Sequence, residues 1–242
     1  MPTSTGMMGG YPGSVNVYKF KRATDISERL KRRRMPDDIA EIEGEEVTLQ
    51  LRQENFLQQP DDVYAVIWSA AGGFGDPLAR DPEKVREDVV EQRSVSPASA
   101  RAIYGVVLGA EGEVDAPATH ALRAERRDAN RKKDGSVARL AGKVVAQVTD
   151  NFELRREKSG LHAACTKCAA DLGPVRGNYK DRCVKRESDI VTANPNIGDY
   201  RRYIDDRPVF RQFFCPGCGA LIENEIARAD DAVLHDIELH LR

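Results

Sequence analysis

Two short stretches decide the fold of this chain, Cys165-Thr-Lys-Cys168 and Cys215-Pro-Gly-Cys218-Gly219. Each has the Cys-x-x-Cys spacing, and 46 residues lie between them. If the chain folds back on itself, each pair supplies half of a tetrahedral site of four sulfurs. Zn²⁺ suits such a site because it binds thiolate well and tolerates tetrahedral geometry. Four protein ligands leave no position for a reactive water, so the sequence predicts a structural zinc ion held by these four cysteines.

The second stretch is the stronger signal. Pro216 and Gly217 favour a tight turn, and Gly219 can take a positive φ that brings amide groups toward the thiolates. The first stretch is followed by Ala169 and departs from this pattern. Two alternatives stay open. A redox-active disulfide is disfavoured because no thioredoxin-like βαβ pattern surrounds the pairs, and four unliganded core cysteines are the other alternative.

The remaining cysteine and the histidines give weaker signals. Cys183 lies in a charged, loop-like stretch, which favours a spare thiol over a replacement zinc ligand. His162 precedes the first pair by three residues, and a surface position is favoured over a contact with the zinc ligands. His235 and His240 are five residues apart, which is a poor spacing for a shared helix face or metal pair. A packing or interface role is favoured for them over proton transfer.

A glycine-rich segment, Gly72-Gly-Phe-Gly75, precedes Asp76. It is not a phosphate-binding Walker loop because no Lys-Ser/Thr follows, and a tight turn is favoured over a ligand-facing loop. Asp76 and Arg80 flank it and are the candidates for residues near a partner's active site. No catalytic residue is assigned within this chain.

Composition limits the classes of function. Among 242 residues, 31% are charged, the net charge is −2 and the pI is about 6.2. A mixed surface of this kind argues against a nucleic-acid partner. The basic run Lys31-Arg-Arg-Arg34 is interpreted as a solvated loop or helix end, since Asp37 and Asp38 follow it. No apolar run reaches the roughly 20 residues that cross a membrane. The start lacks the features of a signal peptide, and metal-suited cysteines favour the cytoplasm.

The pattern of the chain predicts short elements separated by turns. Helices are expected after the N-cap residues Asp81, Ser96 and Asp115. Strands are expected at 15–20, 47–51, 63–68, 106–108, 144–148, 209–214 and 220–226. Residues 131–140 are the expected linker, and residues 178–206 are an expected polar excursion between the cysteine pairs.

Three motifs in the N-terminal half resemble the carboxy-terminal region of the hydantoinase B/oxoprolinase family. They are Gly9-Gly-Tyr-Pro-Gly13, Gly72-Gly-Phe-Gly-Asp-Pro-Leu78 with Arg80-Asp-Pro-Glu83, and Val95-Ser-Pro97 with Ala102-Ile-Tyr-Gly-Val-Val-Leu108. Their joint order and spacing is more specific than any one of them. In that family the first motif falls well inside a longer chain, so the resemblance implies a partial domain here.

The C-terminal part resembles the small zinc-binding gamma subunit of acetone carboxylase. The residues that carry this resemblance are Phe210-Arg-Gln-Phe-Phe-Cys-Pro-Gly-Cys-Gly219 and Leu234-His-Asp-Ile-Glu-Leu239. Together the two resemblances imply an α+β chain. Residues 1–139 would be a partial hydantoinase B-like α/β segment completed by a partner chain, and residues 140–242 a mainly β zinc-ribbon module.

Acetone and acetophenone carboxylases are biotin-independent complexes of hydantoinase A-like and B-like chains with a small zinc protein. The resemblance therefore implies a structural subunit of an ATP- and bicarbonate-dependent ketone carboxylase that forms a β-keto acid. ATP and Mg²⁺ or Mn²⁺ would lie on partner subunits. With aromatic residues at only 6%, the chain is expected to complete its core in an obligate hetero-oligomer.

Two other functions stay open. The hydantoinase B-like motifs also fit a subunit of an ATP-dependent hydantoinase, oxoprolinase or lactam amidase. A free-standing zinc-ribbon binding module is the second. A nucleic-acid role for that module is disfavoured because the segment after the ribbon is acidic and would repel phosphate. Its acidic residues are Glu223, Glu225, Asp230, Asp231, Asp236 and Glu238.

Overall fold

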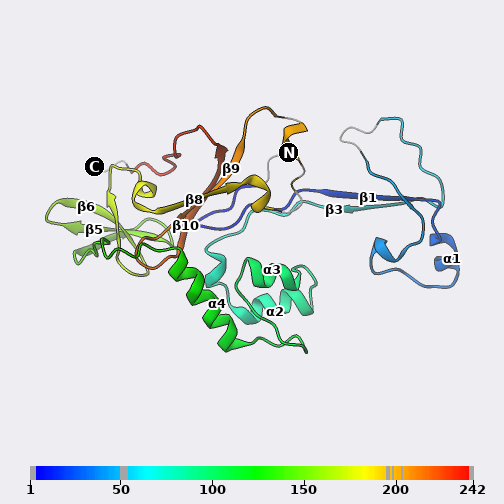
Figure 1. Cartoon of the computed structure of the whole chain (residues 1–242), viewed down its shortest axis with the longest axis horizontal. Coiled ribbons are helices and arrows are strands. Elements are labelled where there is room, and N and C mark those ends of the chain that lie inside the picture. The colour runs from blue at the N-terminus through cyan, green and yellow to red at the C-terminus, as the bar shows by residue number, and fades with distance from the viewer. Residues whose placement is uncertain (1–3, 50–53, 195–196, 198, 203, 240–242) are drawn as a thin grey trace. The chain divides into compact units, whose positions relative to one another are not determined.

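The computed structural model describes residues 4–49, 54–194, 197, 199–202 and 204–239. Its contacts divide the chain into two compact units (Figure 1). We call Ser14–Ala70 the hairpin unit, and Ser4–Gly13 together with Ala71–Arg242 the main unit. The N-terminal segment therefore packs with the C-terminal residues, although the hairpin unit separates them in sequence.

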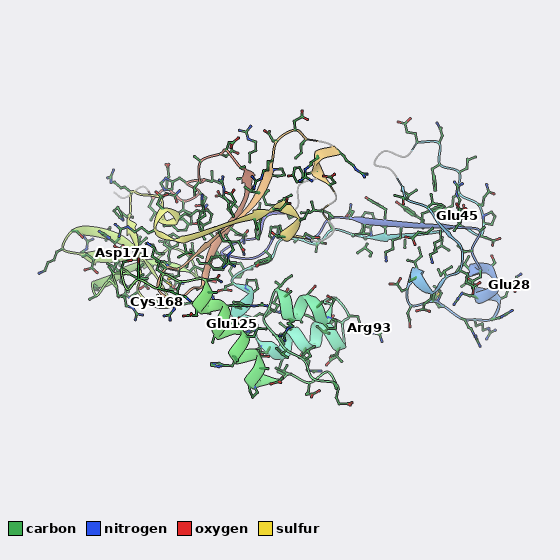
Figure 2. All side chains as sticks on the ribbon, viewed as in Figure 1. Glu28, Glu45, Arg93, Glu125, Cys168 and Asp171 are labelled. Atoms are coloured by element: carbon green, nitrogen blue, oxygen red, sulfur yellow. The ribbon has the colours of Figure 1, made fainter. Side chains whose placement is uncertain are left out.

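The hairpin unit is a three-stranded antiparallel sheet with one short helix. Its strands are β1 (Val17–Arg22), β2 (Glu45–Glu46) and β3 (Val63–Ile67), in the order β2-β1-β3, and its helix is α1 (Ile26–Lys31). The strands expected at 15–20 and 63–68 are confirmed. The one expected at 47–51 is wrong for Val47 and Leu49, which lie outside any strand, while Leu51 is outside the described residues. Charged side chains such as Glu28 and Glu45 are exposed (Figure 2).

Three helices in the main unit begin at the expected caps. They are α2 (Pro82–Val90), α3 (Pro97–Ala102) and α4 (Ala116–Ala129), each with proline at its start. The side chains of Asp81, Ser96 and Asp115 each accept a hydrogen bond from a backbone N–H of the first turn, which satisfies an otherwise unpaired donor. The helices enclose a small core of Val85, Ala100 and Val106. The strand expected at 106–108 is reduced to an isolated bridge between Leu108 and Val114.

Two antiparallel sheets form the rest of the main unit. One has the order β4-β5-β6-β7 and consists of β4 (Lys143–Gln147), β5 (Phe152–Glu157), β6 (Gly160–Cys165) and β7 (Asp171–Pro174). The other has the order β10-β9-β8 and consists of β8 (Val184–Asp189), β9 (Pro208–Phe214) and β10 (Leu221–Arg228). Side chains of both sheets share one core, to which Phe152, Leu172, Phe213 and Ile222 belong.

The strands expected at 144–148, 209–214 and 220–226 are confirmed within two residues. Residues 178–206 are not simply a polar excursion, because they contain β8, the third strand of the second sheet. Short 3₁₀ helices complete the fold at Ile39–Glu41, Pro77–Ala79, Tyr179–Arg182, Ile190–Thr192 and Tyr200–Arg202. In the described part of the chain, no helix has the length and apolar character needed to span a bilayer.

Two glycine-rich motifs interlock through their backbones in the main unit. Met7 N donates to Gly73 O at 2.9 Å, Gly73 N to Tyr11 O at 2.8 Å, and Gly75 N to Met7 O at 3.0 Å. A Cβ on Gly10 would lie 2.6 Å from Phe74 N, and one on Gly72 would lie 2.8 Å from Gly6 Cα. Glycine is needed here because the two backbones approach too closely for any side chain. The glycine-rich residues 72–75 are therefore held by backbone hydrogen bonds to the segment Ser4–Gly13.

The fold as a whole is a mixed α/β arrangement of small sheets with one cysteine cluster. The boundary proposed at residues 139/140 concerns sequence families, whereas contacts group the residues differently, because Ser4–Gly13 and Ala71–Arg242 form one unit.

Candidate metal centre

The first cysteine pair lies in a tight turn between β6 and β7. Cys165 is the last residue of β6, and the chain reverses through Thr166 and Lys167 to Cys168. Cys165 N donates to Ala170 O at 3.0 Å, and Ala169 N donates to Cys165 O at 2.8 Å. Ala169 has a φ of 57°, so a residue with a side chain holds the left-handed conformation here.

The second pair lies in an equivalent turn between β9 and β10. Cys215 N donates to Ala220 O at 2.7 Å, and Gly219 N donates to Cys215 O at 2.9 Å. Gly219 has a φ of 70°, close to that of Ala169. The two turns therefore have the same hydrogen-bonding pattern, and the alanine that departs from the expected Cys-x-x-Cys-Gly pattern does not change the loop geometry.

Glycine at position 217 lets the two turns approach each other. A Cβ on Gly217 would lie 2.9 Å from Ala170 Cβ and 3.0 Å from Cys168 Sγ. Because the first distance is shorter than real Cβ contacts and the second is tighter than nearly all of them, a larger residue would push the first turn away from the second. The Pro-Gly dipeptide thus determines how closely the sulfurs can gather.

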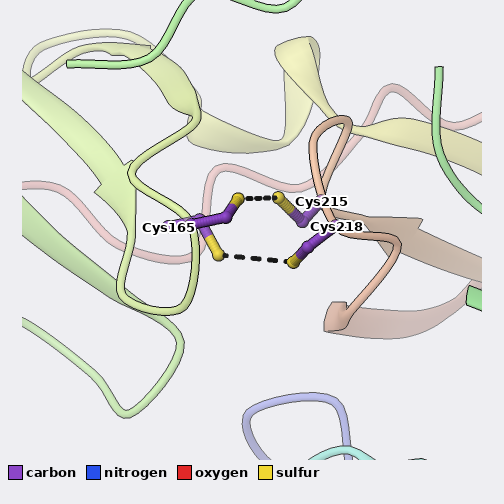
Figure 3. A group of neighbouring side chains, drawn as sticks. Cys165, Cys215 and Cys218 are labelled. Carbon is purple, nitrogen blue, oxygen red and sulfur yellow. Dashed lines mark hydrogen bonds between the residues drawn. The ribbon is translucent and has the colours of Figure 1, made fainter. Parts of the chain in front are cut away.

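The four sulfurs form one cluster, in which Cys165 and Cys218 face each other, as do Cys168 and Cys215 (Figure 3). The sulfur–sulfur distances across these pairs are 3.9 Å and 3.5 Å, and all four atoms lie within 4.8 Å of one another. A Zn–S bond of about 2.3 Å places sulfurs about 3.8 Å apart in a tetrahedron. A disulfide needs about 2.05 Å, so the thiols are free. The cluster can hold a metal ion, and its size and chemistry agree with zinc.

Burial and mutual hydrogen bonding make the four thiols unequal. Hydrogen bonding to the Cys165 thiol lowers the pKa of Cys168 to about 7. It also lowers the pKa of Cys218 well below its usual range. The same network raises the pKa values of Cys165 and Cys215. Four thiolates this close repel one another, so a divalent cation is the natural way to ionise all of them.

Cys183 takes no part in this cluster. Its thiol is buried in the shared core, donates to Tyr179 O at 3.6 Å, and has a pKa raised to about 12 by burial. This position agrees with the favoured interpretation of Cys183 as a spare thiol and not with the alternative of a replacement ligand. Cys183 itself belongs to no helix or strand, as its flanking charges had indicated, and it joins the 3₁₀ helix Tyr179–Arg182 to β8.

The histidines are not brought together with the cysteines. His162 lies on β6, where its Nδ1 is 3.1 Å from Asp171 Oδ1, and only 15% of its side chain is exposed, so a surface position is wrong. His235 lies in an irregular segment between Val233 and Ile237, which pack against the shared core, and its Nε2 is buried without a hydrogen-bond partner among the described residues. His120 is exposed on α4, and His240 is outside the described residues.

Asp76 is part of the internal structure rather than of an open loop. It is 6% exposed, and its carboxylate accepts Leu221 N and Leu78 N, each at 3.0 Å, and pairs with Arg127 of α4. Asp76 therefore joins the glycine-rich loop, a helix and the strand that follows the second cysteine turn. Arg80 pairs with Asp88 at 2.6 Å on the helical part.

A buried ionic cluster on the second sheet was not expected. Arg211 and Lys180 have side chains only 2% and 1% exposed, and both contact Glu225, each at 3.2 Å. Arg211 also contacts Glu187, and Lys180 contacts Asp236. The one available signal was the charged residue Arg211 inside the largely apolar strand Val-Phe-Arg-Gln-Phe-Phe.

The acidic residues after the ribbon are not all available to repel phosphate. Glu225 is paired with Lys180 and Arg211 in the ionic cluster. Glu223 accepts hydrogen bonds from the backbone N–H groups of Met8 and Gly9 at 3.1 Å and 3.3 Å. Burial raises the pKa of Glu223. The expected repulsion of phosphate is therefore wrong for Glu223 and Glu225.

Comparison with known proteins found a match for the C-terminal part of the chain. A search of curated proteins found no match. The family model described as "Acetone carboxylase gamma subunit" matches residues 139–242, a range that includes β4–β10 and all four clustered cysteines.

Proposed function

We propose that the chain is a structural, zinc-binding subunit of a biotin-independent ketone carboxylase complex of the acetone or acetophenone carboxylase type. The observation that carries this proposal is the match of residues 139–242 to the acetone carboxylase gamma subunit, together with the cysteine cluster inside that range. In this proposal the complex joins a ketone and bicarbonate to a β-keto acid with ATP. ATP and Mg²⁺ or Mn²⁺ belong to partner subunits.

In this proposal, zinc joins two turns that the sequence keeps 46 residues apart. Cys165 and Cys168 hold it from the β6–β7 turn, and Cys215 and Cys218 hold it from the β9–β10 turn. Because all four positions are protein ligands, the ion supplies folding free energy and no Lewis-acid chemistry. The reduced thiols that it needs are consistent with the cytoplasm as the proposed compartment.

The hairpin unit supports the need for a partner. Within its described residues, the apolar side chains that are fully buried are those of Phe20 and Ile42. Tyr18 and Tyr64 stack with ring centroids 6.2 Å apart yet are each 45% exposed, and Trp68 is 74% exposed. A unit with so small a core gains stability by packing against another chain. We propose hydantoinase A-like and B-like subunits as that partner, with residues 1–139 completing a hydantoinase B-like domain.

The test is native mass spectrometry of the complex purified from its own cells through a tag on this chain. The expected result is co-purification of hydantoinase A-like and B-like chains with one zinc ion per copy, and ATP hydrolysis that depends on bicarbonate and a ketone. ATP hydrolysis stimulated by a hydantoin or lactam and not by bicarbonate would instead identify an amidase. A lone, fully folded chain would refute the subunit proposal.

A matched pair of variants distinguishes loss of partners caused by loss of zinc from loss of partners during purification. Cys218→Ser removes one proposed ligand, whereas Cys183→Ser removes a buried thiol outside the cluster. We expect the first to lose zinc and partners and the second to keep both.

A further inference from the structure

A cavity of about 310 Å³ lies in the main unit, between the helical part and the second sheet. Side chains of α3, α4, β8, β9 and the residues around Asp76 line it, and Tyr11 of the N-terminal segment contributes as well. Its volume is at the lower end of the range for small-molecule sites. It does not include the cysteine cluster, so nothing in the proposed role of zinc accounts for it.

The charges around this cavity do not balance. Three arginines line it, Arg126 and Arg127 from α4 and Arg186 from β8. Asp76 is the acidic residue of the lining, and it is already paired with Arg127. Among the described residues, no carboxylate lies within ion-pair distance of Arg126 or Arg186. The cavity therefore has two guanidinium charges without a counter-ion.

Neutral groups hold these two arginines in place. Arg126 donates to Ala102 O at 2.9 Å. Arg186 donates to Asn130 Oδ1 at 2.7 Å and lies over the Phe214 ring at 5.3 Å. Since each side chain uses one terminal nitrogen in these bonds, further N–H groups remain to bind an oxyanion. Arg186 is exposed and Arg126 is half-buried, so a ligand from solvent can reach both charges.

Tyr11 adds a neutral donor. Its hydroxyl oxygen accepts a hydrogen bond from Gln212 Nε2 at 3.0 Å, so its own proton is available for another acceptor. Burial raises the pKa of Tyr11, which keeps that proton in place at neutral pH. The apolar side chains of Leu78, Ile103 and Phe214 form other parts of the wall. Donors and apolar surface together match a molecule that has an anionic head and an apolar body.

We propose that this cavity binds a small organic oxyanion, with a carboxylate or phosphate group facing Arg126, Arg186 and Tyr11 and an apolar body against Leu78, Ile103 and Phe214. The proposal goes beyond the role of the zinc subunit, because it concerns a ligand site within this chain that is independent of the metal.

The test is isothermal titration calorimetry of benzoate and phenyl phosphate into the zinc-loaded full chain or, if the chain needs its partners, into the purified complex. Benzamide has the same ring without the charge and serves as the control ligand. We expect either anion to bind at least tenfold more tightly than benzamide. The tighter of the two anions identifies the head group. Equal heats for anion and amide, or no heat from any of them at about 10 mM, would overturn the proposal.

Matched variants locate the site. Arg186→Gln and Arg126→Gln each remove one unpaired charge and should weaken anion binding by about tenfold, which corresponds to one charge-assisted hydrogen bond. Arg101→Gln makes the same change at an exposed position outside the cavity and should leave binding unchanged. Thermal melting checks that each variant is folded. If the folded Arg186 variant bound the anion as well as the Arg101 variant, the site would be elsewhere.

Discussion

Gly219 and Ala169 occupy equivalent positions in the two cysteine turns, yet exchanging their residue types should change stability by very different amounts. Both residues have a left-handed backbone, with φ values of 70° and 57°. They differ in surroundings. A Cβ on Gly219 would lie 2.9 Å from the carbonyl carbon of Arg127 and 3.1 Å from its Cα, with the carbonyl oxygen nearer still. The backbone of α4 thus occupies the place that the side chain of Ala169 has in the other turn.

The expected changes in stability follow from two contributions, the cost of the left-handed backbone and the cost of steric overlap with α4. In Gly219→Ala, the left-handed conformation costs about 1 kcal/mol and forced overlap with a backbone about 2 kcal/mol more, a total of about 3 kcal/mol. For a chain of this size, that loss lowers Tm by about 6–12 °C. In Ala169→Gly, relief of about 1 kcal/mol is offset by the greater entropy of the unfolded chain, so stability should change by less than about 1 kcal/mol.

Differential scanning calorimetry of the zinc-loaded variants, with zinc content measured in parallel, checks this pair. The reasoning would be refuted if Gly219→Ala melted within about 2 °C of the parent protein. It would also fail if Ala169→Gly lost as much stability as Gly219→Ala, because the backbone contact with α4 would then not explain the difference.

Three further predictions concern the metal, the ionic cluster and pH. Cys215→Ser should release zinc and unfold the β4–β10 region, because structural zinc contributes about 10 kcal/mol or more; full near-ultraviolet circular dichroism without zinc would contradict this. Glu225→Ala leaves Arg211 and Lys180 without their shared carboxylate and should cost about 3–5 kcal/mol in urea unfolding, against almost nothing for the exposed Glu125→Ala. Burial raises the pKa of Glu223 above its ordinary 4.5, so its contribution to stability is largest below pH 4.5 and falls as pH rises through the folded-state pKa. The Tm of the parent minus that of Glu223→Gln should therefore decrease from pH 4.5 upward, and a difference that grows with pH would sink the assignment.

The sequence predicted those parts of the fold that depend on local chemistry. The helix starts at Asp81, Ser96 and Asp115 follow from capping and a following proline, which act within one turn. The cysteine cluster could be predicted because two Cys-x-x-Cys pairs supply the four thiolates that zinc prefers in a tetrahedral site. The position of the second pair between two strands followed from the apolar run before Cys215, whereas the strands β6 and β7 that flank the first pair were not predicted.

What escaped prediction depends on contacts distant in sequence. Glu187 and Arg186 made β8 look like part of a polar loop, because nothing nearby reveals that Arg211 and Asn130 are their partners. Asp76 resembled a residue available to a partner's active site, whereas its partners Arg127 and Leu221 are 51 and 145 residues away. Charged residues satisfied by distant groups cannot be told from solvated ones by local pattern.

The N-terminal segment also has a consequence for the order of folding during synthesis. Met8 N bonds Glu223 across 215 residues of sequence, and Asn224 Nδ2 bonds Gly10 O across 214. The N-terminal segment can form its backbone bonds to Gly73 and Gly75 early, but its contacts with Glu223 and Asn224 must wait until β10 has been made. Pairings of such long range slow folding, because the loop that they close must be ordered first. During that interval the N–H groups of Met8 and Gly9 and the carbonyl of Gly10 lack their final partners, and they stay unpaired in the newly made chain until β10 is complete.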